Sequence, residues 1–89
     1  MALQILGSPS NPDEVVDQLR EAIARDFPQA TIEVRASGGA HFEISVTSEC
    51  FEGQSRLAQQ QAVYAAIAHL MKGTNPAVHA IDKLETRVE

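Results

Sequence analysis

Four side chains in this sequence are suited to binding a transition metal, namely His41, Cys50, His69 and His79. A single cysteine excludes an internal disulfide and a metal site built from cysteines alone. A histidine ligand must be neutral and accessible, and a hydrogen bond to its second ring nitrogen normally orients it. His79 lies at the start of a predicted strand, directly after a turn, and His41 begins another strand. Both positions suit a ligand, and both also suit a histidine that forms local hydrogen bonds at a strand end.

The sequence lacks the motifs of several common enzyme classes. It contains no serine elbow with histidine and aspartate partners, no phosphate-binding P-loop and no HExxH pair. Asp13 and Glu14 suit the start of a helix, where they complement the helix dipole, better than an acid–base pair in a cleft. We therefore expect a protein that is not an enzyme.

Length and composition indicate one small domain. The 89 residues leave no room for a second core. We expect a single domain over residues 1–89, with a lead segment at 1–10 and a short tail at 85–89. The first ten residues lack the pattern of a targeting segment, and no apolar run approaches the ~18 residues of a membrane span. These features predict a cytoplasmic protein without a membrane partner.

The formal charge of −5 is unevenly distributed along the chain. Residues 1–54 contain three cationic and nine acidic side chains, whereas residues 55–89 contain four and three. The overall charge argues against nonspecific binding to a phosphate backbone, which needs clustered cations. Between Ser55 and Lys72 there is no acidic residue. We therefore expect the surface with Arg56, Gln60 and Lys72 to be the partner face, where the Arg56 guanidinium suits a carboxylate or a phosphate.

Periodicity and turn residues predict a helix and two strands in the first half of the chain. Asn11 is a suitable cap for a helix over residues 12–27, whose apolar residues recur at helical spacing. Alternating patterns predict strands at 31–35 and 41–47, joined by a Ser-Gly-Gly turn at 37–39.

The second half of the chain predicts a helix and a third strand. Ser55 caps the helix, Lys72 lies with His69 in its last turn, and Gly73 ends it. The third strand is predicted at 78–84, where a change in apolar parity suggests a β-bulge or an early end of the strand. The order α-β-β-α-β implies an α+β fold, a three-stranded mixed sheet with both helices packed on one face. The apolar stripe of the second helix comprises Leu57, Val63, Ile67, Leu70 and Met71.

Three ordered blocks of the sequence resemble the BolA-like protein family. They are His41-Phe42 through Phe51-Glu52-Gly53-Gln54-Ser55-Arg56, then Val63-Tyr64, then Val78-His79-Ala80-Ile81. The resemblance covers residues 12–84 and implies a class II KH-like fold with the element order given above. The short Gly-Gly loop and the Gln-Gln before Val63 are most similar to the short-loop bacterial subgroup called IbaG-like. The chain departs from the family at Gln59-Gln60-Gln61, where many members have Arg-His-Arg, and in its last residues, which lack a Thr-Pro-rich tail.

The resemblance implies a partner protein. BolA-like proteins associate with monothiol glutaredoxins, with or without a bridging [2Fe-2S] cluster, and are linked to iron–sulfur cluster trafficking and iron homeostasis. The cluster is expected only in a heterocomplex with glutaredoxin and glutathione, since one cysteine cannot hold it and histidine can replace cysteine on one iron. His79 matches the family's ligand histidine. His41 is the candidate second ligand, because the short loop before it lacks the cysteine or histidine that many members have there.

Other residues and functions are alternatives to this interpretation. Cys50 matches no ligand position of the family and is expected to be a small buried side chain, whereas His69 is expected to be solvated.

Some members of the family act as DNA-binding regulators of transcription in stress response or morphology. DNA binding through Arg56 and Lys72 is therefore the alternative function, although the second glycine of a KH-type GXXG loop is missing after Gly53. An adaptor that binds a protein without metal is a third alternative, and we expect a monomer or weak homodimer when free.

Overall fold

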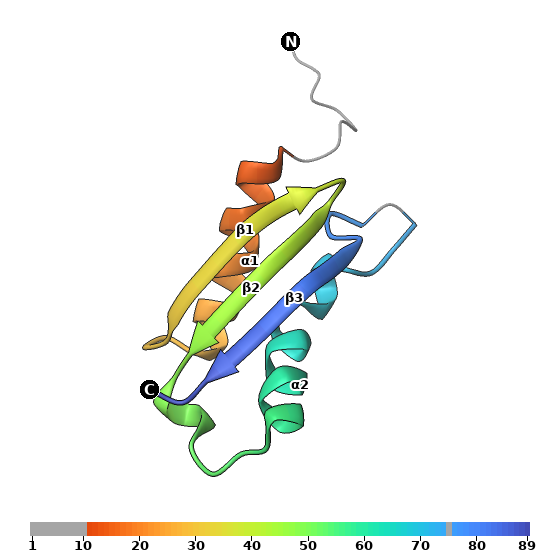
Figure 1. Cartoon of the computed structure of the whole chain (residues 1–89). Coiled ribbons are helices and arrows are strands. Elements are labelled where there is room, and N and C mark those ends of the chain that lie inside the picture. Colours follow the sequence, from red (N-terminus) through yellow and green to blue (C-terminus); the bar gives the residue numbers. More distant parts are fainter. Residues whose placement is uncertain (1–10, 75) are drawn as a thin grey trace.

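The computed structural model describes residues 11–74 and 76–89, so the predicted lead segment at 1–10 lies outside the described residues. Figure 1 shows both α-helices on one side of a three-stranded sheet, whose other face is open. The predicted element order and α+β class are confirmed. The elements are α1 (Pro12–Asp26), β1 (Thr31–Gly38), β2 (His41–Thr47), the 3₁₀ helix η1 (Glu49–Phe51), α2 (Arg56–Ile67), the 3₁₀ helix η2 (Ala68–Leu70) and β3 (Ala80–Arg87).

Helix α1 begins at its predicted cap. The Oδ1 atom of Asn11 accepts a hydrogen bond from the backbone N–H of Asp13 at 2.7 Å, which satisfies one of the free donors of the first turn. The helix ends at Asp26 and is followed by the C-cap residue Phe27, whose ring packs against that of Phe51 with a centroid separation of 5.3 Å. The buried face of α1 consists of Val15, Leu19, Ala22 and Ile23, at helical spacing.

Strand β2 is the centre of the sheet. It pairs antiparallel with β1 and parallel with β3, in the order β1-β2-β3. Its alternation buries Phe42, Ile44 and Val46 beneath the helices and turns the intervening polar side chains to the open face. Strand β1 extends three residues past its predicted end, because Gly38 still pairs with His41.

Helix α2 begins as predicted and ends early. The Ser55 hydroxyl accepts a backbone N–H at 3.1 Å, but the α-helical turns stop at Ile67 and tighten into η2. The prediction that Lys72 lies in the last turn is therefore wrong, and Lys72 is exposed in the loop after η2. The carbonyl of Leu70 accepts the N–H of Val78 at 3.1 Å, so the following loop occupies an acceptor that a longer helix would use.

The buried face of α2 includes Gln59 and excludes Leu57, which was predicted to belong to the apolar stripe of this helix. Leu57 is 64% exposed, whereas Gln59 is only 7% exposed. Gln59 lies four residues before the fully buried Val63 and shares its face, but Leu57 lies six residues before it, about a third of a turn away. Leu57 therefore does not belong to the predicted apolar stripe.

Strand β3 is displaced from the predicted strand at 78–84. Val78 is fully buried in the preceding loop, and the strand itself follows the whole of β2, from the partner of His41 to the partner of Thr47. Residues 85–87, predicted to form a tail, therefore belong to β3. Charged side chains alternate along this part of the strand, so an apolar pattern does not reveal it.

The apolar core lies between the covered face of the sheet and the two helices. Phe51 from η1 and Val78 from the loop before β3 close it at its two ends, and both are fully buried. Among the residues that the structure describes, no helix has both the length and the apolar character to cross a membrane.

Candidate functional site

The turn between β1 and β2 and the beginning of β3 lie at the same end of the sheet (Figure 1). Here the backbone N–H of His79 donates to the carbonyl of Ala40 at 2.8 Å, and Ala80 is the partner of His41. His79 and His41 are therefore one residue out of register on chain segments about 4.8 Å apart. His79 is exposed, and 43% of the His41 side chain is exposed. The topology thus brings together two candidate ligands that are far apart in the sequence.

The imidazole of His41 is held on one side by a carboxylate. Its Nδ1 atom lies 2.8 Å from Oδ1 of Asp82, and the hydroxyl of Ser37 donates to Oδ2 of the same carboxylate at 2.9 Å. The hydrogen bonds with His41 and Ser37 hold the pKa of Asp82 below its ordinary value of 3.8. The ends of all three strands therefore contribute to one polar cluster on the open face.

A β-bulge brings Asp82 into this cluster. Phe42 pairs with Ile81, but the next pair is Glu43 with Lys83, so Asp82 is an extra residue in β3. A bulge adds a residue to one strand and re-aims its side chains. Of the two alternatives that the parity change suggested, a bulge or an early strand end, the structure has the bulge. That parity change was the only local signal, and it did not identify Asp82 or its contact with His41, because the contact depends on strand pairing.

The hairpin turn beside His41 has a backbone conformation that favours glycine. Gly38, Gly39 and Ala40 have φ angles of 107°, 61° and 64°. The left-handed conformation costs a residue with a Cβ roughly 1–2 kcal/mol, so Ala40 is the strained position. Because its carbonyl accepts the His79 N–H, this strained residue joins the turn to the start of β3.

The other two candidate ligands lie outside this cluster. Cys50 lies in η1 beyond the opposite end of β2, and it is exposed, which contradicts the expectation of a buried side chain. The Ser48 hydroxyl caps η1 by accepting the Cys50 N–H at 3.0 Å, and the next residue, Phe51, takes the buried position. His69 is exposed in η2, as expected for a solvated histidine. Within residues 11–74 and 76–89, no group of three or more His, Cys, Asp or Glu side chains could hold a metal ion.

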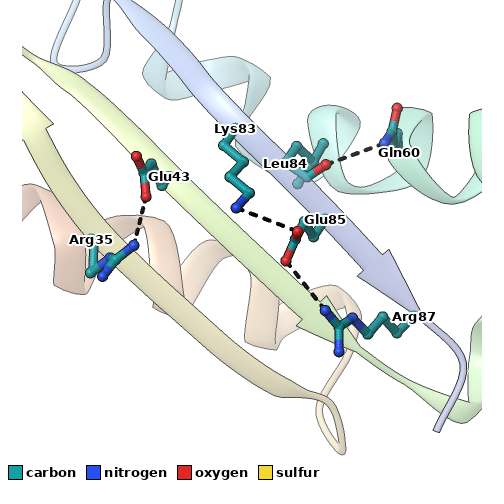
Figure 2. A network of polar contacts seen from close by, with 7 residues as sticks. All are labelled: Arg35, Glu43, Gln60, Lys83, Leu84, Glu85 and Arg87. Carbon is teal, nitrogen blue, oxygen red and sulfur yellow. Dashed lines mark hydrogen bonds and ion pairs between the residues drawn. The ribbon is translucent and has the colours of Figure 1, made fainter.

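The predicted partner residues do not form one surface. Arg56 and Gln60 line a groove of about 180 Å³ beside the end of β3, and the Gln60 amide donates to the carbonyl of Leu84 at 3.2 Å (Figure 2). Lys72 lies beyond the other end of α2, whose 12 residues span about 18 Å. Arg56 and Gln60 are therefore neighbours, and Lys72 is remote from both.

The open face of the sheet carries paired charges of both signs. Arg35 donates to Glu43 at 2.8 Å, and Glu85 lies 3.5 Å from Lys83 and 3.6 Å from Arg87 (Figure 2). Because each of these cations has an acidic neighbour, this face does not present the clustered positive charge that phosphate-backbone binding requires.

Comparisons with known proteins agree on one family. The family model described as BolA-like protein matches residues 20–88. The crystal structure of a Bol-like protein from Babesia bovis has 25% identity and a TM-score of 0.70, over 92% of this chain and 88% of that one. The solution structure of BolA1 from Mus musculus has 26% identity and a TM-score of 0.68, over 99% and 75%. The solution structure of yeast Fra2 has 25% identity and a TM-score of 0.62, over 89% and 80%. A search of curated proteins found no match.

Proposed function

Because the chain belongs to the BolA-like protein family, we propose that it is a non-enzymatic partner of a monothiol glutaredoxin. In this complex His79 and His41 bind one iron of a [2Fe-2S] cluster that the two proteins share, in iron–sulfur cluster trafficking and iron homeostasis. The observation that supports the proposal best is the β2–β3 pairing, since it brings the backbones of His79 and His41 onto adjacent chain segments at an accessible end of the sheet.

The ligands on this chain suit a shared cluster better than one that the chain holds alone. A [2Fe-2S] cluster needs four ligands, and two histidines can replace two cysteines on one of its irons. The described residues offer two exposed or half-exposed histidines on adjacent chain segments, while Cys50 lies at the far end of the sheet. The glutaredoxin cysteine and the glutathione thiol therefore complete the set on the other iron. The cluster is cargo of the heterocomplex, so the task of this chain's residues is to bind and release it.

The scaffold around the two histidines is suited to holding ligands without enclosing them. The backbone bond from His79 to the hairpin turn fixes the start of β3, and both side chains remain accessible to a second protein. A ligand on a strand end is positioned by the sheet hydrogen bonds, whereas a ligand on a free loop must be ordered on binding.

Anaerobic cluster reconstitution with a monothiol glutaredoxin and glutathione tests this function. The visible circular dichroism spectrum is followed while wild type, His79→Ala or the control His69→Ala is added. We expect wild type and His69→Ala to change the spectrum and to co-elute with glutaredoxin and iron, and His79→Ala to lose both effects. A spectral change that survives in His79→Ala would contradict the ligand assignment. The absence of any change or co-elution with wild type would contradict the partnership with that glutaredoxin.

A further inference from the structure

We infer that Asp82 is the positioning residue for the His41 ligand: it holds the imidazole in the tautomer whose Nε2 atom binds iron. The inference rests on the proposed function, since it concerns the same site. It adds a residue that lies outside the ligand set and assigns the ligating atom of His41.

The hydrogen-bonding geometry determines the tautomer. A carboxylate is ionised at neutral pH and can only accept hydrogen bonds. Because Nδ1 of His41 lies 2.8 Å from Oδ1 of Asp82, Nδ1 carries the proton and donates it. In the neutral ring the lone pair is then on Nε2, the atom directed away from the carboxylate. Histidine ligands commonly have this arrangement, with the second nitrogen bonded to a carboxylate that fixes the ring.

The carboxylate is itself held in place from a second strand. Ser37 donates to Oδ2 of Asp82 at 2.9 Å, so each oxygen of the carboxylate has its own donor. The bulge shifts the register of β3 by one residue at Asp82, while Ile81 and Lys83 on either side still pair with β2. Three strand ends thus determine the orientation of one ring. Even with a protonated His41, an exposed ion pair of this kind contributes only about 0–1 kcal/mol to stability, so stabilisation alone is a weak reason for this arrangement.

The tautomer is measured directly on the free protein by long-range ¹H–¹⁵N correlation of the histidine rings, at a pH above the ordinary histidine pKa of about 6.5. In wild type we expect a protonated Nδ1 and an unprotonated Nε2 for His41. In Asp82→Ala the ring should change to a mixture of tautomers, and Ser37→Ala should give a smaller change. Glu85→Ala is the matched control, because it removes another open-face carboxylate of β3 that contacts Lys83 and Arg87. A wild-type His41 ring protonated on Nε2, or one unchanged in Asp82→Ala, would overturn the inference.

Cluster retention in the heterocomplex with glutaredoxin tests whether this orientation serves ligation. Loss of such a carboxylate partner typically weakens metal binding 10–100-fold, so Asp82→Ala should lose its cluster to a chelator at least about 10-fold faster than Glu85→Ala. Asp82→Asn, which keeps the side-chain size, replaces Asp82→Ala if the latter does not fold. Equal retention in the Asp82 and Glu85 variants would overturn the positioning role while leaving the partner function intact. Failure of wild type to form any heterocomplex would instead overturn the proposed function and the ligating role of His41. The tautomer experiment needs no glutaredoxin, so its result would separately decide whether Asp82 orients the ring.

Discussion

At the scale of single residues, the hydrogen bonds of His41 and Ser37 with Asp82 give its carboxyl a measurable acid–base property. They lower the pKa of Asp82, with His41 as the larger cause. A carboxyl whose pKa is lower in the folded state contributes stability above its unfolded pKa, and this contribution is lost as the pH falls through the folded value. The Asp82 contribution is therefore complete at neutral pH and disappears below about pH 3.8.

The side-chain carboxyl carbon of Asp82, followed by NMR through an acid titration, tests this prediction. We expect a midpoint below 3.8 in wild type. His41→Ala should return the midpoint towards 3.8 by more than Ser37→Ala does, because the bond with His41 is the larger cause. A wild-type midpoint at or above 3.8 would contradict the hydrogen-bonded geometry of the cluster.

Ala40 provides a second prediction at this scale. Replacing it with glycine removes a Cβ at a φ of 64°, which relieves roughly 1–2 kcal/mol of strain. The greater freedom of glycine in the unfolded chain offsets about 0.4–1 kcal/mol. We expect Ala40→Gly to raise the free energy of unfolding by about 0.5–1 kcal/mol in urea denaturation. Ala36→Gly, at a strand position without positive φ, should be destabilising instead, and stabilisation by both substitutions would contradict the assignment of strain to Ala40.

The sequence identified some residues of the site and missed others for a physical reason. His79 and His41 could be selected because motifs and strand starts are local features of the chain. Ser37 and Asp82 could not, because their contact depends on the pairing of three strands and on the register shift in β3. Cys50 was expected to be buried from its residue type, but the cap of η1 turns Phe51 inward in its place.

At the scale of elements, the buried Gln59 connects α2 to two other parts of the fold. Its amide nitrogen lies 3.0 Å from the carbonyl of Gln54 and 3.4 Å from that of Phe51. Its Oε1 accepts the hydroxyl of Thr86 in β3 at 2.7 Å. All three hydrogen bonds of the side chain are made within the fold, so Gln59 is a structural residue rather than part of a partner surface.

Gln59→Ala should leave the buried Thr86 hydroxyl without its acceptor, whereas the Phe51 carbonyl still accepts the backbone N–H of Gln54 at 3.0 Å. An unsatisfied buried polar group costs about 1–3 kcal/mol, so we expect the free energy of unfolding to fall by about 1–3 kcal/mol in chemical denaturation. Gln61→Ala, on the exposed side of the same helix, should change it by less than about 0.5 kcal/mol. Similar values for the two variants would contradict the role of the Gln59 network.

The elements differ in how far local sequence determines them. Asn11 and Ser55 cap their helices where the sequence predicted, because caps depend on neighbouring residues only. The end of α2 depends on a bond from Val78 to Leu70 across the loop, and the length of β3 depends on the length of β2. These long-range constraints explain why the predicted bounds of α2 and β3 were wrong while β2 was predicted correctly.

At the scale of the whole molecule, the charge distribution opposes the alternative function of DNA binding. The net charge is −5, the charges of the open face are paired, and Arg56 is remote from Lys72. We expect no binding to random duplex DNA at about 50 mM salt, where phosphate contacts are strongest. Fluorescence anisotropy measures this, with Arg56→Ala as the comparison. Binding that weakens steeply with salt and is reduced in Arg56→Ala would contradict this expectation and favour the alternative function.

The most direct test of the central claim is pulsed electron paramagnetic resonance of the reduced heterocomplex. This chain carries ¹⁵N-labelled histidine, whereas glutaredoxin and glutathione are unlabelled, so any strong ¹⁵N coupling to the cluster must come from a histidine of this chain. We predict ¹⁵N couplings typical of directly bound imidazole, and none of them should be lost in the control His69→Ala. A stable heterocomplex whose cluster has no ¹⁵N coupling would contradict the claim that this chain supplies histidine ligands to a shared cluster.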